Sequence, residues 1–278
     1  MSTQNALLTI LTEKINNDTL VLPTLPAIAL KVRKAADDPD INLNEMADVI
    51  GQDPSLSARM IKISNSAYMS RSVKVSSVNQ AVTRIGLRQI KNISTALAME
   101  QLFVSKNALV ADYMKREWEK TVDVVANAMA VLQIYIKRTK KRDLSLDSMT
   151  LAGLVAKIGV LPILTEAERH SEVFANPTFL EDAIDKMAGK VGANIMTAWG
   201  FSKEFTEVSE SWRDLSVLPP QLSYLDFVRV GAAVSGQMES QKDAVMNLAI
   251  QRGALTDIHE LDSDEFKEMR DNGKLIFA

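Results

Sequence analysis

A long amphipathic segment over residues 112–138 most constrains what this chain can fold into. Its apolar side chains follow one another at intervals of 4, 3, 4, 3 and 4 residues: Trp118, Val122, Val125, Met129, Leu132 and Ile136. That spacing places them along one face of an α-helix. Further apolar residues widen this face: Val124, Ala128, Val131 and Tyr135. We therefore expect a long helix that is buried on more than one side.

The composition of the 278-residue chain favours helices elsewhere too. Aromatic residues make up only 5% of the chain, and aliphatic residues and methionine supply most of the apolar content. Alanine, leucine and methionine lose little side-chain freedom in a helix. No pattern in the sequence predicts a sheet. Because there is no cysteine, disulfides, thiolate metal ligands and cysteine nucleophiles are excluded.

Charge and hydropathy indicate a soluble cytoplasmic protein. The first residues show no basic segment followed by an apolar core, so we expect no secretory signal. No uninterrupted apolar run approaches the roughly 20 residues of a membrane span. The formal net charge of −3 argues against a general nucleic-acid binder, whose affinity depends on neutralising phosphates. We therefore expect neither a membrane nor a nucleic acid as a partner.

Capping signals divide the first part of the chain into short helices. The pairs Asn42/Glu45 and Ser77/Gln80 have the spacing of capping boxes. Asp53 directly precedes a proline, which is typical of an N-cap followed by the first helical residue. The first hundred residues are therefore expected to form a compact group of short helices.

The second part of the chain contains several more helical patterns. Residues 151–164 are almost continuously apolar and predict one central buried helix. Three further helices are expected over residues 182–199, 205–212 and 222–238. The segment from residue 242 onward predicts a modest helix and then an acidic, weakly patterned tail.

Four motifs near the start of the chain resemble those of a known family. They are Leu22-Pro23-Thr24-Leu25-Pro26, Gln52-Asp53-Pro54-Ser55-Leu56, Ile63-Ser64-Asn65-Ser66-Ala67-Tyr68 and Ala81-Val82-Thr83-Arg84-Ile85-Gly86-Leu87-Arg88. Their order and spacing are similar to those of the HDOD domain family (HD-related output domain), a degenerate relative of the HD-type metal-dependent phosphohydrolases. The resemblance extends over most of the chain.

The resemblance implies a fold and a role. The fold would be all-α, with a helical N-terminal subdomain (residues 1–107) packed on a degenerate HD-phosphohydrolase-like helical subdomain (residues 108–240). A C-terminal helix and tail (residues 241–278) would follow. The role would be regulatory, in bacterial signal transduction, and exercised through contact with a protein partner. Because a fold does not determine a function, this role is an expectation by analogy.

The resemblance also shows where a metal site would have been. In the HD phosphohydrolases, imidazole and carboxylate ligands from several helices hold one or two divalent metals. The positions that match carry Lys120, Ala156, Lys157, Ala188, Trp212, Arg213 and Ala232. None of these side chains serves as a metal ligand at neutral pH. We therefore expect no cofactor and no enzyme activity, and a metal-dependent phosphohydrolase would require this correspondence to be wrong.

The cationic substitutions leave two interpretations open. If Lys120, Lys157 and Arg229 converge, they could hold a small anion or a nucleotide where metal charge once stood. Alternatively, Lys157 pairs with a nearby acid such as Glu117 or Glu119. We favour the pairing, because an unpaired buried ammonium group would lose its proton or cost several kcal/mol.

Polar residues of the signature motifs are candidates for contact with a partner or ligand: Asp53, Asn65, Ser66 and Arg88. For Asn65 and Ser66 the alternative is a structural role, in ending a helix and in hydrogen bonding between the subdomains. That structural role is the favoured interpretation.

The last signature motif also resembles a helix-turn-helix superficially, because polar and basic residues flank a glycine between two helical patterns: Arg84, Arg88, Lys91 and Asn92. The same residues match the Gly-Leu-Arg segment of the HDOD family, where they belong to the helical core. We therefore favour a structural role for this segment over DNA binding.

Overall fold

The structure is a computed structural model that describes residues 6–66, 69, 73–170 and 177–277. Over these residues the fold is all-α and contains no strand, which confirms the expected fold class. In the N-terminal half, the observed helices lie where the sequence predicts them. The C-terminal half differs from the prediction in two places, described below.

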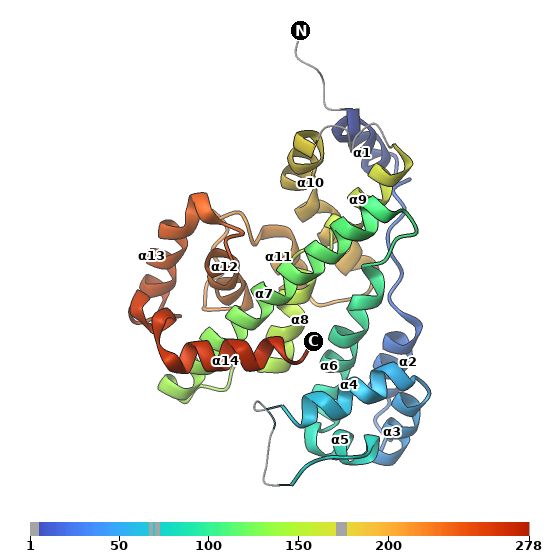
Figure 1. Cartoon of the computed structure of the whole chain (residues 1–278), viewed down its shortest axis with the longest axis vertical. Helices are drawn as coiled ribbons and strands as arrows, with labels where there is room; N and C mark the ends of the chain where they lie inside the picture. Colours follow the sequence, from blue (N-terminus) through green and yellow to red (C-terminus); the bar gives the residue numbers. More distant parts are fainter. Residues whose placement is uncertain (1–5, 67–68, 70–72, 171–176, 278) are drawn as a thin grey trace.

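One long helix, α7 (Ala108–Thr139), crosses the molecule (Figure 1). Its N-cap, Asn107, accepts hydrogen bonds from the backbone N–H groups of Leu109 and Val110. The helix contains the predicted segment and starts four residues earlier. Every residue over 124–132 is buried, so more than two turns of α7 are enclosed on all sides. The wide apolar face therefore predicted the burial correctly.

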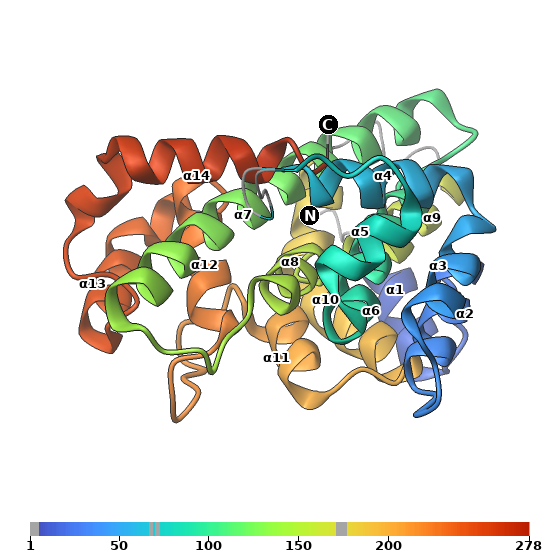
Figure 2. The same ribbon diagram turned by 90° about the horizontal axis from the view of Figure 1, so that it is seen from below.

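Three helices enclose this middle part of α7: α8 (Leu146–Val155), α12 (Tyr224–Val234) and α14 (Asp264–Lys274). Figures 1 and 2 show α14 lying along one side of α7. The closest approach is made by α12 at Gly231. A Cβ atom at this residue would lie 2.4 Å from the backbone oxygen of Val124 and 2.9 Å from the backbone nitrogen of Ala128. Only glycine fits this contact without displacing one of the helices.

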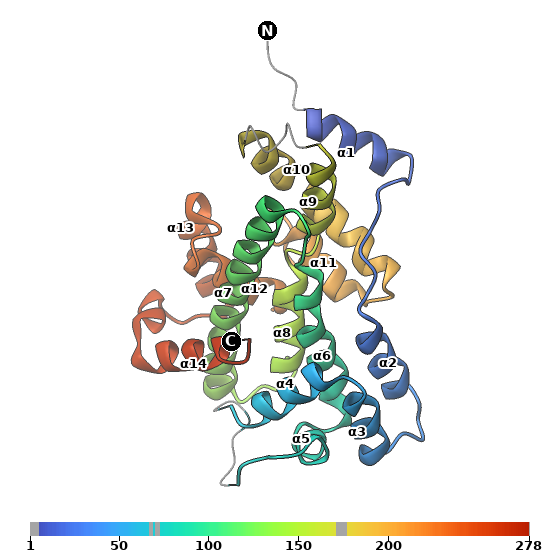
Figure 3. The same cartoon turned by 45° about the vertical axis from the view of Figure 1, so that its right-hand side comes forward.

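Five short helices form a group at one end of the molecule (Figure 1). They are α2 (Ala27–Ala36), α3 (Leu43–Gly51), α4 (Pro54–Ser64), α5 (Val78–Ile85) and α6 (Leu87–Ala98), which continues into a 3-10 turn, η1 (Met99–Leu102). Helix α6 also packs against α8, and Figure 3 shows the two running side by side. This contact joins the group to the rest of the fold.

The starts of α3 and α4 follow their capping signals. Asn42 Oδ1 accepts hydrogen bonds from the N–H groups of Asn44 and Glu45, both at 3.0 Å, and the Glu45 carboxylate accepts one from the N–H of Asn42. The capping box is therefore complete. Asp53 Oδ1 accepts a hydrogen bond from the N–H of Leu56 at 2.9 Å. Both N-caps are confirmed.

At α5 the predicted capping box forms only in part. Ser77 Oγ accepts a hydrogen bond from the N–H of Gln80 at 3.2 Å, as expected of the N-cap. The side chain of Gln80, however, accepts its backbone hydrogen bond from the N–H of Ser76 instead of Ser77. Gly86 then ends α5 with a φ of +85°, a conformation that glycine adopts without strain.

The apolar stretch over 151–164 forms two helices instead of the single helix that we expected. Helix α8 ends at Val155, and α9 (Val160–Arg169) begins after a turn over residues 156–159. At Gly159 another helix comes so close that a Cβ atom would lie 1.9 Å from the backbone oxygen of Ala188. Because the turn is as buried as the helices on either side, the apolar pattern continues through it and hides the break.

The segment Leu146–Arg169 is long and apolar enough to cross a membrane, judged by length and composition alone, with a mean hydropathy of 1.6 in its most apolar window. In the fold, 89% of that window is buried inside the protein. Its apolar side chains are therefore covered by the protein's own helices, as in the core helices of many globular folds.

The remaining helices match the predicted ones in position. They are α1 (Ala6–Asn16), α10 (Pro177–Ala198), α11 (Lys203–Ser211) and α13 (Lys242–Arg252), with short 3-10 turns at η3 (Glu239–Gln241) and η4 (Ile258–Asp262). Helix α1 packs against α9 and α10, and α10 packs against α11.

The C-terminal segment is more regular than the expected tail, because it contains α14. Phe266 and Ile276 are buried, and the ring of Phe277 lies 6.0 Å from that of Trp118 on α7. The prediction of a weakly patterned tail is therefore wrong. Few apolar residues are enough here, because α7 provides most of the apolar surface in this contact.

We predict that Gly231→Ala lowers the free energy of unfolding by about 1–3 kcal/mol, because its methyl group overlaps the backbone of α7. Gly51→Ala is the matched control, since no atom lies within 4 Å of a Cβ placed at that helical residue. Urea unfolding of the two variants measures the difference. Equal stability of the two variants would contradict the close packing of α12 on α7.

Candidate functional site

The candidate site is a cavity of about 390 Å³ that lies between the α8–α9 turn, α10 and the loop after α11. Five of the seven substituted ligand positions line it: Ala156, Lys157, Ala188, Trp212 and Arg213. Residues from three distant parts of the sequence therefore meet where the family resemblance placed a metal site. The other two positions lie elsewhere: Lys120 is on the exposed side of α7, and Ala232 is buried within α12.

The charge of Lys157 is neutralised beside the cavity by Glu117 of α7. The Lys157 ammonium lies 2.6 Å from Glu117 Oε2, and the two side chains are only 3% and 9% exposed. Lys157 also donates a hydrogen bond to Gln237 Oε1 at 3.1 Å. The second oxygen of Glu117 accepts a hydrogen bond from Lys120 at 2.9 Å. One buried carboxylate therefore holds two ammonium groups, as the pairing interpretation anticipated, and Glu119 is exposed.

The surroundings change the pKa values of both buried groups. Burial alone would raise the pKa of Glu117, but the charge of Lys157 and the hydrogen bonds from Lys157 and Lys120 outweigh it, and the pKa is lowered. Burial lowers the pKa of the Lys157 ammonium, and repulsion from Lys120 and Arg213 adds to this, while attraction by Glu117 opposes it. Glu117 is therefore ionised at neutral pH, and its attraction opposes the lowering of the Lys157 pKa by burial.

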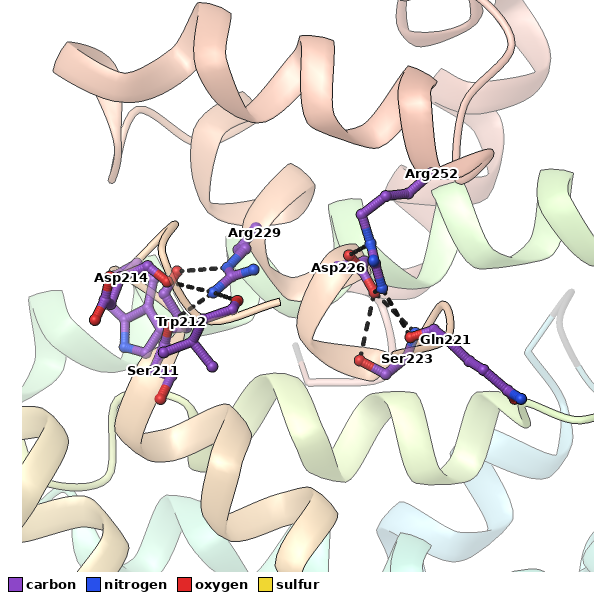
Figure 4. A network of polar contacts seen from close by, with 9 residues as sticks. Ser211, Trp212, Asp214, Gln221, Ser223, Asp226, Arg229 and Arg252 are labelled. Atoms are coloured by element: carbon purple, nitrogen blue, oxygen red, sulfur yellow. Dashed lines mark hydrogen bonds and ion pairs between the residues drawn. The ribbon is translucent and has the colours of Figure 1, made fainter. Parts of the chain in front are cut away.

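Arg229, the third cation of the alternative anion-binding cluster, does not join the two lysines. Its guanidinium, which is 1% exposed, donates to backbone oxygens of the loop after α11 (Figure 4). The acceptors are Ser211 at 3.0 Å, Trp212 at 3.4 Å, Val217 at 2.8 Å, and Asp214. The pairing that we favoured is therefore the arrangement seen here, and the alternative cluster of Lys120, Lys157 and Arg229 does not form. Arg229 instead holds in place the loop that forms one wall of the cavity.

A neighbouring network fixes the start of α12 (Figure 4). Arg252 of α13 binds the Asp226 carboxylate through two nitrogens, at 2.6 and 3.1 Å, and the backbone oxygen of Gln221 at 2.7 Å. Asp226 also accepts a hydrogen bond from the N–H of Ser223 at 2.8 Å. We did not predict this network from the sequence. Ser223 and Asp226 have the spacing of a capping box, which could have predicted the start of α12.

The other charged side chains around the cavity are largely paired. Arg213 forms an ion pair with Asp185, and its guanidinium lies 4.6 Å from the centre of the Trp212 ring. Lys186 lies 2.7 Å from Asp182. Both acids lie on α10 and neutralise these two cations, so the cavity wall is not a concentrated positive surface.

The cavity does not fit the metal ion that HD phosphohydrolases hold. Lys157 and Arg213 are cations, and Ala156 and Ala188 provide no ligand atom. Across the residues that the structure describes, no three histidine, aspartate or glutamate side chains are grouped so that they could hold a metal. The side chains at the positions where the resemblance placed a metal site therefore do not suit one.

The polar signature residues Asn65 and Ser66 serve the N-terminal helices. Asn65 donates to the backbone oxygen of Val75 at 2.7 Å and accepts from its N–H at 2.8 Å. Ser66 Oγ donates to the backbone oxygen of Ile63 at 2.6 Å, at the end of α4. These residues end a helix, as the structural interpretation expected. Their hydrogen bonds lie within the N-terminal subdomain, whereas we had expected them to connect the two subdomains.

The helix-turn-helix-like segment uses its polar side chains internally. Arg84 donates to the backbone oxygens of Ser64, at 3.0 Å, and Val73. Lys91 forms an ion pair with Asp37. Both contacts are as expected of a structural role in the helical core. Arg88 differs from these residues, because its side chain is exposed and lines a second cavity.

Comparison with known proteins identifies the family. The HDOD domain matches residues 22–214, and the chain belongs to this family. Over 100% of both chains it is 42% identical, with a TM-score of 0.94, to a crystal structure from Shewanella amazonensis SB2B that is provisionally assigned as a metal-dependent phosphohydrolase. A protein from Marinobacter aquaeolei VT8, provisionally assigned to signal transduction, shares the fold at 19% identity and a TM-score of 0.57, covering 94% of this chain and 59% of that one.

A curated relative from Treponema pallidum (strain Nichols), named only as an uncharacterized protein, is 25% identical over 190 residues. The match covers 64% of this chain and 35% of that protein. The chain thus spans about a third of the length of this relative.

We predict that Glu117→Gln lowers the free energy of unfolding by about 3 kcal/mol at neutral pH, because it leaves the Lys157 ammonium buried without its counter-charge. The matched control is Glu119→Gln, which alters an exposed carboxylate two residues away. Urea unfolding measures both variants. A loss for Glu117→Gln no larger than for Glu119→Gln would show that the pair does not stabilise the fold.

The same pair predicts how stability depends on pH. The folded state lowers the pKa of Glu117 below its usual 4.5, so its contribution is complete above pH 4.5 and is lost as pH falls through the folded-state pKa. The stability difference between the unaltered protein and Glu117→Gln should therefore shrink below pH 4.5. Unfolding measured along a pH series tests this, and a difference that stays constant into acid would contradict it.

Proposed function

We propose that this chain is a non-catalytic HDOD domain of a cytoplasmic signalling pathway, which acts by contact with a protein partner. The observation that carries the proposal is the buried pair of Lys157 and Glu117 beside the cavity. A hydrolytic site of the HD type needs a metal-bound water that attacks a phosphate ester. Here a lysine with its own counter-ion stands at a ligand position.

The names of the similar proteins support two different activities. One relative is assigned to metal-dependent phosphohydrolysis and another to signal transduction, and both assignments are provisional. The ligand chemistry of this chain favours the second. The alternative of an anion held by Lys120 and Lys157 is less favoured, because Glu117 already pairs with both lysines.

The N-terminal group of helices offers the surface for a partner. Asp53, Asn65 and Ser66 of the signature motifs use their side chains within it, so a partner would have to contact other side chains. Leu30 on α2 is 52% exposed, which leaves a large apolar side chain in water on a regular helix. Such side chains, when they lie in an interface, contribute to binding by burial.

We predict that the purified protein takes up no manganese, iron or nickel in stoichiometric amount and hydrolyses neither phosphate monoesters nor diesters. Metal analysis by mass spectrometry after dialysis against each metal, and assays with generic nitrophenyl esters, provide the measurement. An HD phosphohydrolase with its full set of histidines, treated in the same way, is the positive control. One tightly held metal ion per chain would overturn the proposal.

We predict that Leu30→Asp abolishes capture of a protein partner from extract of the native cell, because it places a charge in the apolar contact. The matched control is Leu218→Asp, which alters a leucine of nearly equal exposure, 50%, outside the N-terminal group of helices. Cross-linking followed by quantitative mass spectrometry measures both variants. Equal loss in both, or loss in neither, would exclude Leu30 from the partner contact.

A further inference from the structure

A second cavity, of about 590 Å³, lies where the N-terminal helices meet the rest of the fold. It is bounded by α6, the end of α7, the loop that leads into α8, and the start of α12. In Figure 2, α8 lies between α6 and α12, and both helices pack against it. Its lining includes Arg88, Asn92, Arg142, Asp147 and Tyr224. Its volume lies within the range of about 300–1,000 Å³ that is usual for small-molecule sites.

One carboxylate in this cavity is almost fully buried. Asp147, on α8, is only 5% exposed. Its Oδ2 accepts a hydrogen bond from Asn92 at 2.8 Å, and among the described residues it forms no ion pair. Buried aspartates are ordinarily paired with a cation or satisfied by several donors. A group that donates hydrogen bonds would therefore bind favourably beside Asp147.

Two guanidinium groups lie on the same cavity. Arg88 is on α6 and Arg142 is in the loop after α7, and both side chains are exposed. Neither makes an ion pair within the described parts of the chain. Arginine binds phosphate oxygens through two parallel hydrogen bonds. Asp143 also lines the cavity, so that its acids balance its arginines. This balance suits a ligand that carries an anionic group at one end and hydrogen-bond donors at the other.

The start of α8 contributes more weakly to anion binding in this cavity. Ser145, its N-cap, makes no side-chain capping hydrogen bond, and its backbone N–H donates to the Tyr224 hydroxyl at 2.9 Å. The first N–H groups of a helix favour a nearby anion. Ser148, whose hydroxyl accepts a hydrogen bond from Asn92 at 3.0 Å, also lines the cavity. Backbone and hydroxyl groups thus surround the space between the carboxylate and the arginines.

We propose that this cavity binds a nucleotide, with its phosphate on Arg88 and Arg142 and the amino group of its base donating to Asp147. A nucleotide combines an anion with N–H donors and has a size that suits the cavity. Because α6 and α8 both line the site, the ligand would contact the N-terminal helices and the HD-like helices together. The inference goes beyond the partner-binding function proposed above and does not depend on it.

Isothermal titration of the full chain with AMP, adenosine and inorganic phosphate tests the proposal. AMP should bind more tightly than either of its parts. Arg88→Gln and Arg142→Gln should each weaken AMP binding at least about tenfold, the effect of losing one charge-assisted contact, and should leave adenosine binding unchanged. Asp147→Asn should weaken the binding of both AMP and adenosine. Arg116→Gln, which alters an exposed arginine of α7 that does not line the cavity, is the matched control.

The proposal is overturned if AMP, GMP and CMP all give no heat at millimolar concentration, or if the arginine variants bind AMP as the unaltered protein does. It is also overturned if Lys190→Gln, in the first cavity, weakens binding while Arg88→Gln does not. If Asp147→Asn unfolds, the two arginine variants still decide the question, because both side chains are exposed and their replacement leaves the core intact.

Discussion

The enclosure of α7 is the constraint on which the rest of the fold depends. A helix whose residues over 124–132 are all buried needs apolar neighbours on every side, and no single helix can provide them. Helices α8, α12 and α14 do so together. The requirement explains why α12 carries Gly231 at its closest contact, and why the acidic C-terminal segment becomes helical. Without α14, the side of α7 that carries Ala126 and Trp118 would face water.

Local signals in the sequence predicted helices well where one residue determines the outcome. The N-caps at Asn42 and Asp53 are of this kind, and the apolar seam of α7 is also local because all its residues lie on one helix. Two features of the fold, the turn over residues 156–159 and helix α14, could not be predicted from local signals. The turn over 156–159 is hidden because both flanking helices and the turn itself are buried. Helix α14 is hidden because its apolar partners lie on α7, far away in the sequence.

In the candidate site, too, some contacts depend on packing between segments that are distant in the sequence and could not be predicted from local patterns. Helical geometry separates Glu117 from Glu119 by about 200° around α7, which is why one faces Lys157 and the other faces water. From the sequence, either acid could pair with Lys157. Only the packing of α7 against the α8–α9 turn shows that Glu117 does so. Arg229 could not be placed from the sequence, because its acceptors are backbone oxygens of Ser211 and of the loop that follows it. Every residue carries a backbone oxygen, so the residue types do not show which oxygens accept these hydrogen bonds.

The pair of Lys157 and Glu117 also connects α7 to the turn that lines the first cavity. In an HD site, ligands from several helices converge on a cation and thereby hold those helices together. In this chain the ammonium of Lys157 supplies a cation from within the α8–α9 turn, and Glu117 of α7 and Gln237 beyond α12 converge on it. A covalently attached cation needs fewer ligands than a free metal ion, because it cannot dissociate. The pair therefore joins α7, the α8–α9 turn and the segment after α12 through side chains of the chain itself.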